Sequence, residues 1–265
     1  MPVKDTMRPE PDKKSVLLFY LLKKINKCHR EHQLLADGDR IALALSGGKD
    51  SCTLLDALLQ RRGIEKYTLV PIHVIAATDM DCTSQAHIPT LKAWLDQLGI
   101  EYHMVHAEEV KGVTRRPNQS PCFYCAWRRR KALFAKAQEL GCNKLALAHN
   151  ADDVAQTTML NLFYQGVLTT MLPRVPLFDG RLTLIRPLSY VPEREIVRYA
   201  QEANLPPFPP PCPIGNQSRR ALMRQVLGLV QQGNPRVRWL LWRAVQRRQA
   251  TDAEQDLAEI REQVD

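Results

Sequence analysis

The sequence predicts an α/β fold with a doubly wound, mainly parallel sheet, helices on both of its faces, and helical extensions at both ends. Short, continuous apolar runs of the kind found in buried parallel strands recur along the chain. Each run is followed by a segment with helical apolar periodicity. A glycine-rich turn joins the first run to its helix. Strands and helices that alternate in this way form a parallel sheet.

The first half of the chain contains the clearest elements. Leu54, Leu55, Leu58 and Leu59 recur at helical spacing after the glycine-rich turn, and Gly99 ends a second helical pattern, as glycine often does. We expect a helix at 16–35, a strand at 40–45, a helix at 50–61, a strand at 68–75 and a helix at 88–98.

The second half repeats the alternation and then changes character. We expect a strand at 101–106, a helix at 125–140, a strand at 144–149, a helix at 152–164 and a strand at 183–188. Residues 206–213 include six prolines, which exclude regular structure. Two arginine-rich helices are expected beyond them, at 219–230 and 236–248, and a frayed terminal helix at 251–265. This divides the chain into an N-terminal tail and helix (1–35), a nucleotide-binding α/β domain (36–205), and a proline-rich loop with basic helices (206–265).

The charge balance makes nucleic acid a candidate partner. The 265 residues contain 37 Lys and Arg against 28 Asp and Glu, a net charge of +9, although a generic basic surface would give the same count. Residues 1–14 lack the pattern of a secretion signal, and the apolar run at 16–22 is too short to cross a bilayer. We therefore expect a cytoplasmic protein without a membrane partner. The oligomeric state stays open, with a homodimer as one option.

A candidate phosphate loop follows the first strand. Ser46-Gly47-Gly48-Lys49-Asp50-Ser51 opens a helix, so backbone amides and the helix N-terminus can hold an anion that two glycines allow to approach closely. Lys49 adds a positive charge. The string differs from the GxxxxGK[ST] loop of kinases and GTPases. Asp50 is either a Mg²⁺ ligand or an acidic residue that complements the helix dipole.

Three of the seven cysteines are candidate metal ligands. Cys122 and Cys125 form a CxxC motif at a helix start, which suits a redox pair, half of a zinc site or half of a cluster site. The prolines present Cys212 as a third thiol, and three thiolates would leave one iron of a [4Fe–4S] cluster without a protein ligand. A zinc site from these three cysteines and a histidine is the alternative. Cys28, Cys52, Cys82 and Cys142 are isolated along the chain, and we expect them to be small apolar residues of the core.

Acidic and basic residues accompany these motifs. His149, Asp152 and Asp153 lie where a strand passes into a helix, and the two carboxylates suit capping, Mg²⁺ binding or proton transfer. Residues 128–131 form a basic run directly after the CxxC motif, which is either a solvated surface or a site for RNA phosphates. Arg129 follows Cys125 by one helical turn and faces the same side.

Together these motifs resemble the iron–sulfur-dependent tRNA thiolases of the PP-loop ATP pyrophosphatase type, which make 2-thiocytidine or 2-thiouridine. The resemblance covers roughly residues 35–230, and includes the strings at 46–51, 122–130, 149–153, 160–166 and 185–188 as well as Cys212. Thiocytidine members usually carry a second CxxC where this chain has 212–215, and His-His where it has His149-Asn150. Asp79 or Asp81 would replace the acidic residue usual after the second strand.

The resemblance implies a reaction and a set of roles. ATP, with Mg²⁺, adenylates the C2 carbonyl oxygen of a pyrimidine in tRNA, expected to be a cytidine of the anticodon loop, and sulfur then displaces AMP. The donor is sulfide or sulfur derived from a cysteine desulfurase. Cys122, Cys125 and Cys212 would bind a [4Fe–4S] cluster, residues 46–51 with His149 and Asp153 would bind ATP, and Lys49, Asp152 and Arg129 would serve catalysis.

Three other functions fit parts of the pattern. The two cysteines of the CxxC motif could carry persulfide without any cluster, in which case activity would need no iron. A cluster could instead remove sulfur from a thiolated base, which would need no ATP. A zinc- or iron-containing RNA-binding protein without catalysis is the third, and it leaves the intact phosphate loop and aspartates without a purpose.

Overall fold

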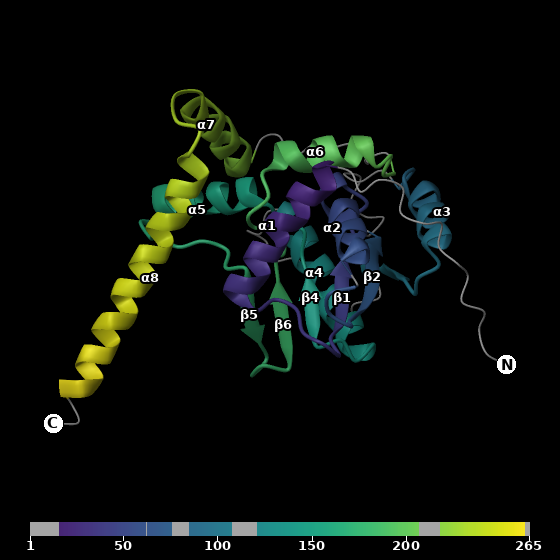
Figure 1. The fold of residues 1–265 in the computed structure, drawn as a ribbon, viewed down its shortest axis with the longest axis horizontal. Coiled ribbons are helices and arrows are strands. Elements are labelled where there is room, and N and C mark those ends of the chain that lie inside the picture. The colour runs from purple at the N-terminus through teal and green to yellow at the C-terminus, as the bar shows by residue number, and fades with distance from the viewer. Residues whose placement is uncertain (1–15, 62, 76–84, 108–120, 207–217, 263–265) are drawn as a thin grey trace.

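A six-stranded sheet forms the centre of the computed structural model, which describes residues 16–61, 63–75, 85–107, 121–206 and 218–262. The strand order is β3-β2-β1-β4-β6-β5 (Figure 1). Neighbouring strands are parallel except at the edge, where β5 pairs with β6 in the antiparallel direction. The strands are Arg40–Ala44 (β1), Thr68–Ile75 (β2), His103–His106 (β3), Lys144–Ala146 (β4), Arg174–Leu177 (β5) and Leu182–Ile185 (β6). The predicted fold class is confirmed.

The order of the strands locates the ligand edge. The chain builds β1, β2 and β3 outward in one direction and then returns to place β4 on the other side of β1. The loops after β1 and β4 therefore diverge at the carboxyl ends of two neighbouring parallel strands, where open α/β sheets bind ligands. The predicted phosphate loop and the segment 149–153 follow those two strands.

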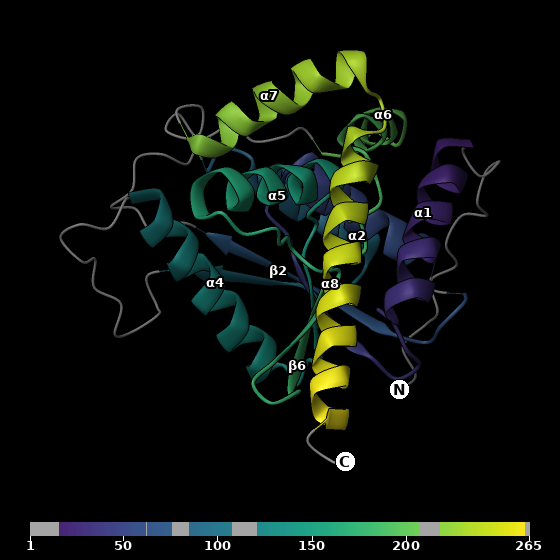
Figure 2. The same ribbon diagram turned by 90° about the vertical axis from the view of Figure 1, so that its left-hand side faces the viewer.

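Helices cover both faces of the sheet, as Figure 2 shows with α1 and α4 on opposite sides. The helices are Val16–His32 (α1), Lys49–Gln60 (α2), Ile88–Leu98 (α3), Pro121–Glu139 (α4), Ala151–Gln165 (α5), Glu193–Glu202 (α6), Arg219–Gly233 (α7) and Val237–Glu262 (α8). Leucines and isoleucines of α1, α2, α3 and α6 share one core with the sheet, whereas small residues of α4 such as Ala132 and Ala137 pack on the other face.

The C-terminal helices pack against α5 and away from the sheet. Ala155 and Met159 of α5 form a small separate core with Met223 and Leu227 of α7, and α8 contacts both helices (Figure 1). This core is small, so α7 and α8 depend on polar contacts as well. No helix in the described ranges is long and apolar enough to cross a membrane.

Several boundaries differ from the expected ones. The segments 68–75 and 88–98 are as predicted, but β5 and α6 were not expected. β5 contains Pro176, which an edge strand tolerates, and α6 begins directly after Pro192. The helix expected at 236–248 and the terminal helix expected at 251–265 form one helix, α8, since neither glycine nor proline interrupts the chain between 248 and 251.

Candidate active site

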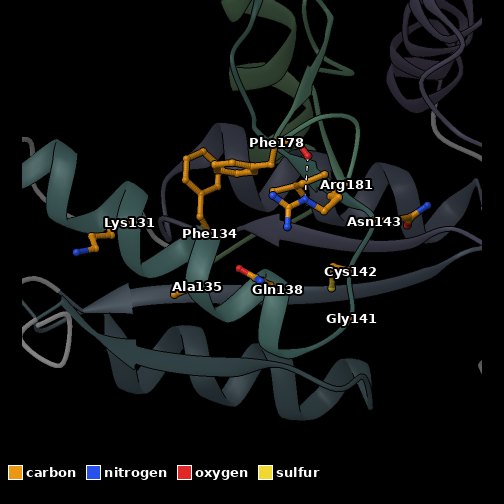
Figure 3. A pocket seen from close by; sticks show the side chains of 10 residues that line it. Lys131, Phe134, Ala135, Gln138, Gly141, Cys142, Asn143, Phe178 and Arg181 are labelled. Carbon is orange, nitrogen blue, oxygen red and sulfur yellow. Dashed lines mark hydrogen bonds between the residues drawn. The ribbon is translucent and has the colours of Figure 1, made fainter.

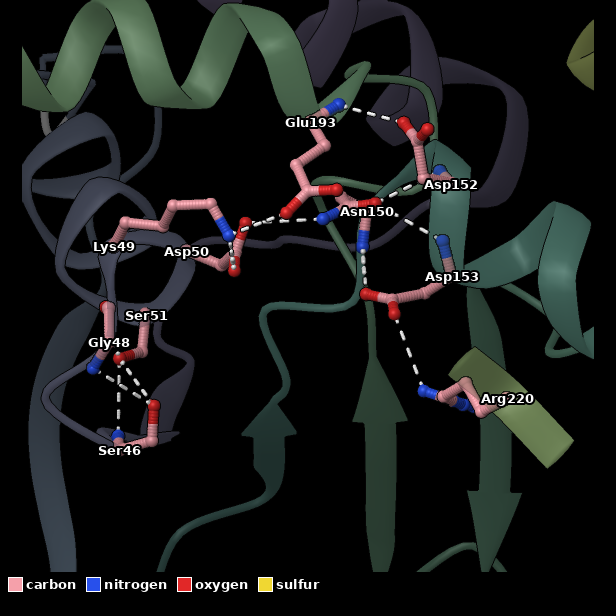
Figure 4. A network of polar contacts seen from close by, with 10 residues as sticks. All are labelled: Ser46, Gly48, Lys49, Asp50, Ser51, Asn150, Asp152, Asp153, Glu193 and Arg220. Carbon is pink, nitrogen blue, oxygen red and sulfur yellow. Dashed lines mark hydrogen bonds and ion pairs between the residues drawn. The ribbon is translucent and has the colours of Figure 1, made fainter. Parts of the chain in front are cut away.

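The phosphate loop is closed by its own serines (Figure 4). Ser51 Oγ accepts a hydrogen bond from Ser46 N at 3.1 Å, lies 3.0 Å from Ser46 Oγ, and donates to Gly48 O at 2.9 Å. Ser46 Oγ also accepts from Gly48 N at 3.2 Å. Gly48 is the N-cap of α2 and offers no side-chain cap, so the start of this helix is suited to an anion.

Gly47 can be no other residue without rearrangement of the loop. Its φ is +78°, and a Cβ atom built on it would lie 2.8 Å from Cδ2 of His87. The ring of His87 in turn lies 5.4 Å from the ring of buried His73, in edge-to-face contact. The side of the loop that faces His87 is therefore closely packed.

Lys49 connects the loop to α6. Its Nζ lies 3.0 Å from Asp50 Oδ2 and 2.7 Å from Glu193 Oε1 in the first turn of α6 (Figure 4). Burial by itself would lower the pKa of Lys49, but the two carboxylates outweigh burial and raise it. Lys49 is therefore a fixed positive charge at the helix start.

Asn150 joins the second motif to the loop. It is the N-cap of α5 and accepts from the backbone N of Asp152 and Asp153, while Asp153 Oδ2 accepts from Asn150 N at 3.1 Å. This capping box uses Asp153. Asn150 Nδ2 also donates to Asp50 Oδ1 at 3.1 Å, so one amide side chain bridges α2 and α5.

The two aspartates of α5 contact different C-terminal helices. Asp152 Oδ1 accepts from Arg238 Nε of α8 at 2.6 Å, and Asp152 Oδ2 accepts from Glu193 N at 2.8 Å. Asp153 Oδ1 lies 3.3 Å from Arg220 Nη1 of α7, and burial raises the pKa of Asp153. Capping therefore accounts for one of the two carboxylates only.

His149 faces a cationic environment. Arg186 Nε, just after β6, donates to His149 Nδ1 at 3.3 Å, and Arg186 also donates to Leu172 O at 2.6 Å. Burial, together with Arg186, Arg220 and Arg130, lowers the pKa of His149 to about 4. Burial and the nearby Arg130 lower the pKa of Arg186 to about 10. His149 is therefore a neutral ring at pH 7, beside several positive charges that suit phosphate.

α4 carries the CxxC motif at its first turn. Cys122 lies in that turn, and Cys125 is half-buried and not part of a disulfide. Arg129 is half-buried too, and its buried Nε has no hydrogen-bond partner in the described part of the chain. Its charge adds a small contribution to the lowered pKa of His73 on β2, so the field of Arg129 reaches the sheet.

Some predicted residues cannot be placed. Cys212, Cys82, Asp79 and Asp81 lie outside the described residues. Within those residues, no group of three or more His, Cys, Asp or Glu side chains is arranged to hold a metal ion. The cysteine cluster thus stays a prediction.

Three isolated cysteines are buried, as expected of small apolar residues. Cys28, Cys52 and Cys142 are all buried and unbridged. Burial raises the pKa of Cys28 and of Cys52 to about 12, and also raises that of Cys142. Thiols with such pKa values are protonated at pH 7 and are poor metal ligands.

Sequence reasoning missed four residues of this network. Asn150 could have been found, because an N-cap residue followed three positions later by an acid is a capping-box pattern. Glu193 follows a proline, which is a weaker signal for a helix start. Arg220 and Arg238 carry no local signal, because their partners are 67 and 86 residues away.

A glycine-rich loop of this build, at the switch point of a parallel sheet, defines a nucleotide-binding domain of the PP-loop class. The sequence model of the PP-loop domain family matches residues 20–229. The tRNA-cytidine(32) 2-sulfurtransferase of Geobacter sulfurreducens is 39% identical over 218 residues, which are 80% of this chain and 83% of that protein. The enzyme of the same name from Geobacter metallireducens is 38% identical over 228 residues, 83% of this chain and 86% of that protein.

A solved structure agrees with the sequence matches. The U34-tRNA thiolase NcsA from Methanococcus maripaludis, determined with its [4Fe–4S] cluster, superposes with a TM-score of 0.74 at 25% identity, over 87% of this chain and 78% of that one. The chain therefore belongs to the PP-loop family of the tRNA-cytidine(32) 2-sulfurtransferases, and the resemblance stated from its motifs is confirmed.

Proposed function

We propose that this protein replaces the C2 oxygen of a tRNA cytidine with sulfur in an ATP-dependent reaction, the activity for which its curated relatives are named. The observation that carries the proposal is the network of Lys49, Asp50, Asn150, Asp153 and Glu193, which connects the phosphate loop to α5 and α6 (Figure 4). A turn with a purely structural role would need neither a lysine held in place by two carboxylates nor the further contacts to α5.

The loop fits the phosphates of ATP. The uncapped start of α2 and the glycines give an anion cradle, and Lys49 supplies a positive charge. Asp50 is the carboxylate best placed to share a Mg²⁺ ion with those phosphates, because it lies in the first turn of α2 beside Lys49. His149 and Arg186 extend the site toward β6.

The ligation chemistry of α4 fits an iron–sulfur cluster. Cys122 and Cys125 are three positions apart in one helical turn, so both positions lie on one side of it, and a helix start favours the thiolate. Cys212 would be the third ligand. When bound, a [4Fe–4S] cluster with three thiolate ligands would supply an iron at which sulfide can be held.

The proposed reaction consists of two successive displacements. The C2 oxygen attacks the α phosphate of ATP and pyrophosphate leaves; sulfide then attacks C2, and the original oxygen departs with AMP. Lys49 and the amides of the loop hold the leaving pyrophosphate. Arg129, whose buried Nε has no partner in the described part of the chain, would hold the acceptor or a phosphate. Asp152 would be the catalytic carboxylate, held in position by Arg238 and by the backbone N of Glu193.

The reaction class is tested by the nucleotide product. Purified protein with ATP, tRNA and sulfide should release AMP and pyrophosphate, and nucleoside mass spectrometry should find 2-thiocytidine in the tRNA. Release of ADP instead would exclude the PP-loop chemistry. Turnover without ATP would favour removal of sulfur from a thiolated base.

The cluster is tested separately. Anaerobically reconstituted protein should absorb in the visible range as an Fe–S chromophore and lose that absorbance on Cys125→Ala or Cys212→Ala. Cys142→Ala is the control, because Cys142 is buried and is not a proposed cluster ligand, so its replacement should leave the spectrum unchanged. Stoichiometric zinc without the chromophore would contradict the cluster, and full activity of iron-free protein would point to persulfide chemistry at the CxxC motif. Comparing turnover with sulfide and with a cysteine desulfurase would identify the sulfur donor. Analytical ultracentrifugation would decide between monomer and homodimer.

A further inference from the structure

A pocket lies at the end of the sheet opposite the phosphate loop. It has a volume of about 670 Å³ and lies between α4, the loop before β4 and the turn that joins β5 to β6 (Figure 3). Phe134 and Gln138 of α4 line one side, and Phe178 and Arg181 of the turn line the other. Asn143 and Leu182, which also line it, lie at the amino ends of β4 and β6, so the pocket is separate from the site that would bind ATP at the carboxyl ends.

Two phenyl rings define this pocket. Phe134 and Phe178 are in edge-to-face contact, with ring centroids 5.7 Å apart and an interplanar angle of 88° (Figure 3). Phe178 is 52% exposed, so core packing does not explain it. A planar ligand could stack on the exposed ring.

The backbone under Phe178 is a costly one for phenylalanine. Phe178 and Asp179 have φ values of +53° and +56°, in the left-handed region that glycine and asparagine adopt most readily. The turn is held by hydrogen bonds from Gly180 N to Leu177 O and from Arg181 Nε to Phe178 O. Backbone strain of this kind is often retained where a side chain has a function.

The charge of the pocket favours an anionic partner. Lys131 and Arg181 line it, and no acidic side chain does among its described lining residues. The basic run 128–131 leads along α4 from Cys125 toward Phe134, about 14 Å away at 1.5 Å per residue. A few nucleotides of single-stranded RNA can span that length.

We propose that this pocket binds an unstacked base of the tRNA, a few nucleotides from the one that is modified, with its phosphate near Lys131 and Arg181. The inference rests on the proposed function for the identity of the RNA. Aromatic stacking with cationic phosphate contacts is how proteins hold single-stranded nucleic acid. Phe178 would then contribute to affinity and to the choice of tRNA and would take no part in the chemistry.

Phe178→Asn tests the proposal with a residue that suits the left-handed backbone. The dissociation constant for tRNA should rise roughly 5- to 100-fold, while the melting temperature stays the same or increases. The KM for tRNA should rise with it and kcat should change little. Phe19→Ala is the control, because Phe19 on α1 is also exposed and paired edge-to-face, with Tyr20. Lys131→Gln should lower the slope of log Kd against log salt by about 1.

The outcomes separate this proposal from the proposed function. Wild-type protein that modifies tRNA, together with a Phe178→Asn variant that binds tRNA equally well, would overturn the pocket assignment. A rise in KM for a protein sulfur donor with unchanged tRNA affinity would assign the pocket to that protein and also overturn it. Wild-type protein that binds tRNA but releases no AMP would contradict the proposed function alone.

Discussion

Replacement of Arg238 by methionine should destabilise the protein by roughly 3 kcal/mol, because it leaves a buried carboxylate without its cation. Arg238 Nε donates to Asp152 Oδ1 at 2.6 Å, and its Nη2 contacts the same oxygen. The side chains of Asp152 and Arg238 are 9% and 19% exposed. Methionine keeps much of the stem volume of arginine, so the change isolates the charge and its hydrogen bonds.

The magnitude follows from the remaining partners of Asp152. Removal of one member of a buried ion pair costs about 3–5 kcal/mol. The lower end applies here for two reasons. Glu193 N still donates to Asp152 Oδ2 at 2.8 Å, and the carboxylate lies in the first turn of α5, where the helix dipole favours negative charge.

Urea unfolding, followed by circular dichroism, would measure the loss. Asp152→Asn in the Arg238→Met background should recover part of it, since an amide is cheaper to bury alone than a carboxylate. Arg243→Met is the control on the same helix, because Arg243 lies over the exposed ring of Trp239 and its loss should cost under about 1 kcal/mol. A free energy of unfolding of Arg238→Met within about 0.5 kcal/mol of wild type would refute the reasoning.

Three further changes probe the site. Gly47→Ala should weaken ATP binding and lower stability by more than Gly38→Ala, because both glycines have positive φ but only Gly47 has a neighbour, His87, in the way of a Cβ; equal losses would contradict this. Burial lowers the pKa of His73 to about 4, so its stabilising effect is complete above its unfolded pKa near 6.5 and is lost as the pH falls toward 4. His73 should account for about 2 kcal/mol of the stability lost between pH 7 and pH 5, separately from the contribution of His149, and His73→Asn should reduce the loss in a stability–pH curve measured in urea by that amount. Lys49→Met should weaken ATP binding roughly 10- to 100-fold by calorimetry, and unchanged affinity would remove it from the site.

The sequence predicted the fold well because its signals are local. The strand at 68–75 is mostly apolar and is buried at every position after Thr68, and the helix at 88–98 ends at a glycine in the left-handed conformation. β5 escaped prediction because it is an edge strand of only four residues, none of them fully buried, and so leaves a weak apolar signal. We predicted two helices where α8 is one because the composition becomes acidic near residue 251. No residue there breaks the helix, so it continues.

The candidate site was predicted only where it is continuous in sequence. The phosphate loop is a single string, and its geometry follows from two glycines and two serines close together. The partners of Asp152 and Asp153 could not be predicted, because arginines at 220 and 238 belong to helices where many arginines occur at similar spacing. Only packing selects which of them reaches a carboxylate.

That selection limits what the PP-loop domain alone can explain. The family match ends at residue 229, within α7, so Arg238 on α8 lies beyond it. Yet Arg238 is a main partner of Asp152, and the other partner, Glu193 N, belongs to the residue whose side chain holds Lys49. The position of the proposed catalytic carboxylate is thus set jointly by the phosphate-loop network and by a helix outside the matched domain. Any change that moves α8, including a bound ligand on its arginines, must therefore alter the contacts of Asp152.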